Sequence, residues 1–292
     1  MEYLLTIFFP QLLHGLVAGS GLALICIGLT LVFGVMNIVN FAHGELFMAG
    51  SFFAYTILLL IPNFWFAMIG AVILTGLLSI LIYRLTIHPI LGRDHMYGLL
   101  VTFGVSMILI ELVRLIWGSV PRQIVEPIPG SVTFWGTTYP SYRLFVLVIT
   151  GPLILGVWGF LYRTRSGMII RATSQDSVMT EILGINIRVF YTAAFVMGGM
   201  LAAMGGVILS PITAVYHTVG SDIILKAFAV TIIGGMGSLP GAIIAALLIG
   251  QVESLSTLWI SHTAARILTF AFMAGILLFK PEGLYPLPEA RR

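Results

Sequence analysis

The chain has 292 residues, of which 59% are hydrophobic and only 9% are Asp, Glu, Lys or Arg. A typical soluble domain is about 45–50% apolar and about 25% charged, and a soluble core of this length could not bury so much apolar surface. The composition therefore excludes a cytosolic enzyme, a disordered tail, a disulfide scaffold and a nucleic-acid-binding protein. The single cysteine, Cys26, excludes an internal disulfide and a cysteine-rich metal site. A multi-span membrane protein remains.

Long stretches without charge predict an all-α polytopic integral membrane protein with a single transmembrane domain over residues 1–292. A helix needs roughly 20 apolar residues to cross a bilayer, where its backbone groups must be satisfied internally. The period-two alternation of a transmembrane barrel is not seen. In chain order, eight spans are predicted at Leu12–Met36, Leu46–Ile61, Phe64–Tyr83, Gly98–Trp117, Leu144–Tyr162, Phe190–Ser210, Ile223–Gly250 and Thr263–Phe279.

The basic residues of the short connections predict the orientation. Connections rich in Lys and Arg face the cytoplasm, which places there the loop 84–97, the segment 163–188 and the C-terminus with Lys280. The segment 119–142, rich in Pro, Gly and Thr, is predicted to be an external loop. Single crossings through the last two apolar runs would then leave the C-terminus outside. One of these runs is therefore expected either to enter and leave on the same side or to hold an extra crossing.

Two spans are interrupted by residues that disfavour a continuous helix. The first runs into the polar residues of Val35–Glu45, and a later one contains four glycines and a proline within Val230–Ala242. Glycine costs about 1 kcal/mol and proline about 3 kcal/mol in a helix interior. Broken backbone at membrane depth is tolerated where it is buried in protein or lines a polar cavity, as at the binding sites of many transporters. Close helix packing is the alternative for the glycine run, and a surface loop is the alternative for the polar run.

A short amphipathic helix is predicted on the cytoplasmic side at about residues 171–186. Ser174 is expected to cap its N-terminus, Asp176 suits the positive end of the helix dipole, and Gly184 is expected to end it. Its apolar stripe consists of Val178, Met179, Ile182 and Leu183. Such a helix could lie on lipid or dock into a groove of another protein.

Charged residues within the spans suggest ion pairs. Glu111 and Arg114, three residues apart, are predicted to pair on one helix face, as are Asp222 and Lys226, four residues apart. Glu253 either pairs with Arg266 across neighbouring helices or faces a partner subunit.

Three segments together resemble the branched-chain amino acid ABC transporter permeases of the hydrophobic amino acid uptake family. Gly28–Glu45 is similar to the signature of that family, and Arg171–Asp176 with Leu183–Asn186, and then Ile233–Ala242, match it in the same order. The resemblance covers nearly the whole chain. It implies a permease subunit that moves branched-chain or other small amino acids, or related small polar solutes, inward by alternating access. The location implied is the inner membrane of a bacterial or archaeal cell.

The resemblance also implies partners: a second homologous permease, two cytoplasmic ATPases and an extracytoplasmic binding protein. This chain has no Gly-x-x-x-x-Gly-Lys-Ser/Thr phosphate loop. ATP and Mg are therefore expected in the ATPases, and no catalytic residue, metal or cofactor is expected in this chain.

Two groups of residues are the candidates for function under this resemblance. The amphipathic helix becomes the coupling helix, and its expected ATPase contacts are Arg171, Asp176, Val178, Met179, Glu181, Ile182, Leu183 and Gly184. The expected substrate pathway or gate consists of Asn37, Asn40, His43, Glu45, Gly234, Gly235, Gly237 and Ser238. Amide side chains both donate and accept hydrogen bonds, and glycines let backbone amides approach a path. His43 could instead be a helix cap or a packed residue.

Two other classes of function are weighed against this one. A self-sufficient channel or secondary transporter for a small polar solute such as urea would explain the broken helices but not the coupling helix. An intramembrane enzyme is disfavoured, because His43-Gly44-Glu45 lacks the second histidine of the His-Glu-x-x-His zinc pattern.

Overall fold

The computed structural model describes residues 7–134 and 137–285. Within these ranges the chain forms eleven α-helices, two short non-α turns and one β-hairpin. The elements are α1 (Phe9–Met36), α2 (His43–Leu60), α3 (Phe64–Ile82), η2 (Tyr83–Ile87), η3 (His88–Ile90), α4 (His95–Trp117), β1 (Ser131–Phe134), β2 (Thr137–Pro140), α5 (Ser141–Arg163), α6 (Arg165–Gln175), α7 (Ser177–Ile182), α8 (Ile187–Leu209), α9 (Val219–Gly234), α10 (Leu239–Ser256) and α11 (His262–Phe279).

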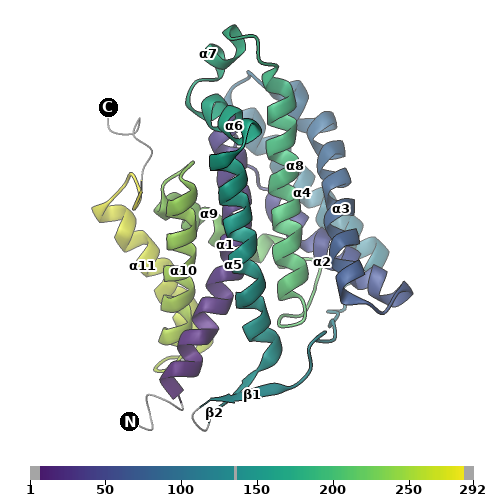
Figure 1. Ribbon diagram of the computed structural model, residues 1–292, viewed down its shortest axis with the longest axis vertical. Coiled ribbons are helices and arrows are strands. Elements are labelled where there is room, and N and C mark those ends of the chain that lie inside the picture. The colour runs from purple at the N-terminus through teal and green to yellow at the C-terminus, as the bar shows by residue number, and fades with distance from the viewer. Residues whose placement is uncertain (1–6, 135–136, 286–292) are drawn as a thin grey trace.

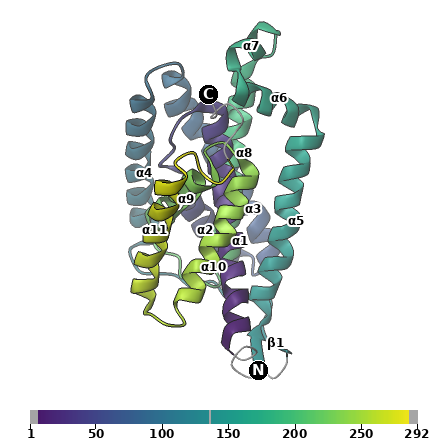
Figure 2. The same ribbon diagram turned by 90° about the vertical axis from the view of Figure 1, so that its left-hand side faces the viewer.

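Helix α1 forms the centre of the bundle (Figures 1 and 2). It is apolar on all sides, which is typical of a helix buried in protein, and 83% of its most apolar 18-residue window is buried. Helices α8 and α10 pack along it. In α5 and α11 only 17% of the corresponding window is buried. These two helices therefore offer apolar faces to lipid or to another subunit.

The two ends of the bundle differ in charge. Helix α7 lies at one end, while the hairpin β1–β2 and the start of α1 lie at the other (Figures 1 and 2). The arginine-rich segment 163–188 is at the α7 end, and the positive-inside rule assigns that end to the cytoplasm. The segment 119–142 lies at the opposite, external end, where the sequence analysis placed it. Its hairpin was not predicted.

The all-α polytopic class is confirmed, and eight helices in the described part of the chain are long and apolar enough to cross a membrane. Seven predicted spans match helices to within about three residues at each end. The one remaining prediction, a single span over Ile223–Gly250, is wrong. Two helices, α9 and α10, occupy this region, joined by a four-residue connection at 235–238. The extra helix resolves the conflict over the C-terminus, because α11 now runs towards the α7 end (Figure 1).

Candidate functional site

The connection between α1 and α2 turns back into the bundle. Asn37 ends α1 in the left-handed conformation (φ 52°), and its backbone N–H donates to the Phe33 carbonyl at 2.7 Å. Helix α2 then begins beside the middle of α1, where His43 Nε2 lies 3.1 Å from the Ile25 carbonyl oxygen. The predicted break in the first apolar region is confirmed, and α2 starts inside the protein. His43 itself is fully buried against α1, as the packed-residue alternative required.

Helix α9 meets α2 at this internal start. A Cβ added to Gly44, in the first turn of α2, would lie 2.2 Å from the Gly220 carbonyl oxygen in the first turn of α9. Only glycine permits so close an approach. The N-terminal ends of two helices, each carrying a partial positive charge, therefore share one buried place, which we call the half-helix junction.

Glu45 occupies the half-helix junction. Its side chain is fully buried, and its Oε1 accepts hydrogen bonds from the Ser106 and Ser221 hydroxyls, each at 3.1 Å. A carboxyl group near helix N-termini is stabilised by their dipoles. The pair of serines also ties α4 and α9 to α2, so Glu45 connects three helices at this point.

Asn40 is buried just before α2 begins, with 1% of its surface exposed. Neither its amide nitrogen nor its amide oxygen has a hydrogen-bond partner among the described residues. A buried polar group left without a partner costs about 1–3 kcal/mol. Both amide atoms of Asn40 are therefore candidates to bind a polar group inside the bundle.

The glycine run forms the tight connection between α9 and α10. Gly235 (φ 102°) and Gly237 (φ 86°) adopt conformations that L side chains rarely reach, and the Ser238 hydroxyl caps α10 by accepting from the Gly241 N–H at 3.3 Å. Gly234 packs against Gly241. The helix break is confirmed, but it lies beside the cytoplasmic end of α1, because a Cβ on Gly34 would be 3.4 Å from the Gly237 Cα.

The predicted pathway residues therefore fall into two places. Asn40, His43 and Glu45 lie at or near the half-helix junction, where all three are buried. Asn37 and Gly237 line a cavity of about 320 Å³ at the cytoplasmic end, together with Ser174 and Gln175 of α6.

The cytoplasmic segment forms two helices where one was predicted. Helix α6 continues through Gln175, and the Ser174 hydroxyl donates within it to the Arg171 carbonyl at 2.8 Å, so Ser174 is not the cap. Asp176 caps α7 by accepting from the Met179 N–H at 2.8 Å. Gly184 (φ 82°) follows the helix end, as predicted. Helix α7 has six residues, so it is shorter than the single helix predicted between Ser174 and Gly184.

The apolar stripe of α7 is exposed at the cytoplasmic end, where α7 projects from the bundle (Figure 1). Val178 and Met179 are 67% and 53% exposed, and Ile182 and Leu183 are each 73% exposed. Glu181 is also exposed. Arg171 has a different environment, since its Nε donates to the Leu161 carbonyl at 3.0 Å and its guanidinium lies over the Tyr162 ring. It thereby fastens α6 to the end of α5.

One of the two predicted ion pairs is confirmed and the other is wrong. Arg114 pairs with Glu111 at 2.6 Å. Lys226 pairs with Glu253 at 2.6 Å across α9 and α10, rather than with Asp222 on its own helix. For Glu253, the alternative of a pair across neighbouring helices is met, but by Lys226 and not by Arg266.

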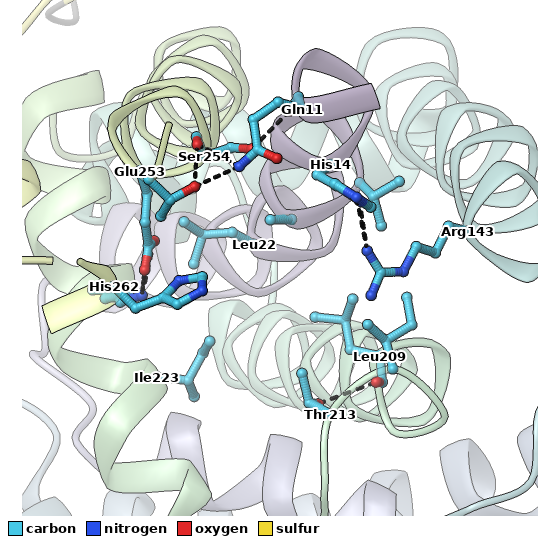
Figure 3. A pocket seen from close by; sticks show the side chains of 16 residues that line it. Gln11, His14, Leu22, Arg143, Leu209, Thr213, Ile223, Glu253, Ser254 and His262 are labelled. Atoms are coloured by element: carbon cyan, nitrogen blue, oxygen red, sulfur yellow. Dashed lines mark hydrogen bonds and ion pairs between the residues drawn. The ribbon is translucent and has the colours of Figure 1, made fainter. Parts of the chain in front are cut away.

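Polar side chains also gather at a second place, which was not predicted from the sequence. A cavity of about 660 Å³ at the external end is lined by the Lys226–Glu253 pair and by His14 and Arg143, which are hydrogen bonded to each other (Figure 3). The available signal was the presence of Lys226 and Glu253 within apolar runs. His14 and Arg143 are 129 residues apart, so no local pattern predicts their contact.

Comparison with known proteins places this architecture in a family. A family model described as a branched-chain amino acid transport system permease component matches residues 11–279. The high-affinity branched-chain amino acid transport system permease protein BraD of Pseudomonas aeruginosa is 31% identical over 98% of each chain. The corresponding LivH protein of Salmonella typhimurium is 31% identical over 98% of this chain and 97% of its own. A probable LivH of Methanocaldococcus jannaschii is 25% identical over 94% of this chain and 91% of its own.

These matches extend from the first helix to the last, and they include the internal helix starts and the cytoplasmic helices described above. The chain belongs to the family of permease components of branched-chain amino acid transport systems.

Proposed function

We propose that this chain is one of two permease subunits of an ATP-binding-cassette importer and that it moves branched-chain amino acids inward across the inner membrane. The names of its relatives support this class of substrate. An extracytoplasmic binding protein delivers the amino acid, and two cytoplasmic ATPases bind ATP and Mg. The second permease is homologous to this one.

The observation that carries the proposal is the exposed apolar stripe of α7 at the cytoplasmic end. Its four apolar side chains are each more than half exposed. Fully burying one such side chain contributes about 1.5–3 kcal/mol, so an ATPase groove that covers the stripe would gain substantial binding energy. A self-sufficient channel has no need of such a surface, and the proposal therefore favours an ATP-driven importer.

The connections of α7 support a role in force transmission. Helix α7 continues into α8 through the short connection 183–186, and α8 packs along α1 and α2. Closure of the ATPase pair would move α7, and α8 would carry this movement to the bundle. The half-helix junction lies against the same helices, and short helices that start inside a protein can shift without breaking a long one. This is the alternating access that the proposal requires.

The predicted pathway residues take separate roles in this proposal. Asn40 gains a hydrogen-bond partner when the junction rearranges or when the amino acid passes, which relieves its unpaired state. Glu45 holds the junction closed through Ser106 and Ser221. The polar cavity at Asn37 and Gly237 is the exit on the cytoplasmic side.

Reconstitution tests the proposal. The chain is incorporated into liposomes with its partner permease, ATPases and binding protein. Uptake of labelled leucine is then measured with and without ATP on the side of the membrane where the ATPases are bound. Uptake that requires both ATP and the ATPases is expected. Leucine uptake by the chain alone, without ATP, would contradict the proposal.

A further inference from the structure

The cavity of about 660 Å³ lies at the external end of the bundle, where an importer must receive its substrate. Its walls come from α1, α8, α9 and α10, with Arg143 from the first turn of α5 and His262 from the start of α11. This volume lies within the range of about 300–1,000 Å³ that is typical of small-molecule sites. The cavity can therefore hold a small solute together with water.

The walls of the cavity are mainly apolar. Leu22, Leu209 and Ile223 come from three different helices and face the space between the polar groups (Figure 3). Val17 and Ile212 extend the same surface. A branched aliphatic side chain fits such a surface, because its burial there removes apolar area from water on both sides.

The charges are placed on opposite walls. Arg143 lies on one side, and Glu253 lies on the other with Leu22 between them (Figure 3). Among the described residues no carboxylate lies within ion-pair distance of Arg143, whose contacts include His14. Glu253 is held by Lys226 through both carboxylate oxygens, at 2.6 and 2.8 Å, and its side chain remains 29% exposed.

We propose that this cavity is the reception site for a zwitterionic amino acid with an apolar side chain, an inference that rests on the proposed function. The substrate carboxylate turns to Arg143, the ammonium group turns to Glu253, and the side chain lies on the leucine and isoleucine wall. A guanidinium without a carboxylate partner favours an anionic group. A ligand carrying only a negative charge would be repelled by Glu253, and one carrying only a positive charge would be repelled by Arg143 and Lys226.

The cavity and the half-helix junction share helix α9. Ile223 lines the cavity and lies two residues after Ser221, whose hydroxyl holds Glu45. Lys226 lies one turn further along α9. An amino acid that shifts α9 from the cavity therefore acts on the helix whose first turn closes the junction.

Thiol labelling in the assembled transporter tests the site. The reporter variant Thr213→Cys places a thiol in the cavity, and Thr133→Cys places one on the external hairpin as a control. The single native cysteine, Cys26, is fully buried and out of reach of a polar maleimide. With leucine as the probe, labelling of the cavity thiol is expected to slow by about fivefold or more once most sites are occupied. Labelling of the hairpin thiol is expected not to change.

Charge variants in the Thr213→Cys background identify the anchor. Arg143→Gln is expected to abolish the protection by leucine, and Arg143→Lys is expected to restore part of it. The matched control is Arg114→Gln, an arginine on α4 outside the cavity, which should leave the protection intact. Leucinamide, which lacks the carboxylate, should protect poorly.

Three outcomes would overturn the inference. The first is a cavity thiol that leucine does not protect in a complex that still pumps leucine. The second is protection that survives Arg143→Gln. The third is a thiol that is blocked in bilayers of anionic phosphatidylglycerol and free in bilayers of neutral lipid whether or not leucine is present, since a lipid headgroup would then be the occupant. A complex with no ATP-dependent leucine uptake at all would instead contradict the proposed function, so the two failures are distinguishable.

Discussion

The close approach of α2 and α9 predicts that Gly44→Ala destabilises the protein. The added methyl group would lie 2.2 Å from the Gly220 carbonyl oxygen and 2.7 Å from the Ile224 Cβ. Ordinary contact begins near 3.4 Å, so the two helix starts must separate by about 1 Å. The obstacle at Gly220 is backbone, and no side-chain rotation can relieve it.

The size of the effect follows from two opposing terms. Overpacking costs about 1–3 kcal/mol, and a backbone obstacle places this substitution near the upper limit. Alanine gains about 1 kcal/mol over glycine in a helix. The net loss of stability is about 2 kcal/mol, which for a chain of this size corresponds to a thermal midpoint lower by about 4 °C.

Thermal unfolding in detergent measures this change. A thiol-reactive fluorophore reports unfolding through Cys26, which is fully buried in α1 in the folded protein. The control is Gly104→Ala in α4, where an added Cβ meets nothing within 4 Å. This control should leave the midpoint unchanged or raise it by no more than about 2 °C. A midpoint for Gly44→Ala equal to or above that of the unmodified protein would refute the helix contact.

Three further predictions concern α7 and the glycine connection. The double variant Met179→Asp, Ile182→Asp is expected to lower uptake by about tenfold or more while ATP hydrolysis continues, since each 1.4 kcal/mol of lost docking energy is a factor of ten; normal uptake would remove the coupling assignment. Asp176→Ala removes the cap of α7, worth about 1 kcal/mol, and hydrogen exchange over residues 177–182 should accelerate by about fivefold; unchanged exchange would contradict the role of the cap. Gly235→Ala forces an alanine to φ 102° at a cost of about 1–3 kcal/mol and should lower the thermal midpoint, whereas Gly275→Ala, with open space around it, should not.

The break between α1 and α2 could be predicted because its cause is local. Asn, His, Gly and Glu interrupt an apolar run within a few residues, and no helix-favouring pattern bridges them. The fate of each side chain was not predictable in the same way. His43 packs on the Ile25 carbonyl because α2 returns along α1, and that return depends on contacts between helices far apart in the sequence.

In the region 219–256 the helix break was predicted, but the number of helices was not. The glycines at 234–237 marked a helix break correctly, yet the pattern could not tell a break within one span from a turn between two helices. Helix α9 has only 16 residues, so its length alone does not indicate a crossing. Its short length is explained by the half-helix junction, where Gly220 meets Gly44.

The ion pairs also differ in whether the sequence could predict them. Glu111 and Arg114 are three residues apart on one helix, and helical geometry alone brings them together. Lys226 and Glu253 are 27 residues apart, and their contact depends on the packing of α9 against α10. The external cavity was missed for this reason, since its charged contacts, Lys226 with Glu253 and Arg143 with His14, join segments that only the folded bundle brings together.

The most direct test of the importer account is a cryo-electron microscopy map of the assembled transporter trapped with a non-hydrolysable ATP analogue. The account predicts that Val178, Met179, Ile182 and Leu183 are buried in a groove of the ATPase, and that the starts of α2 and α9 border the passage between the two permeases. A map in which α7 is uncovered and the half-helix junction faces lipid would contradict it.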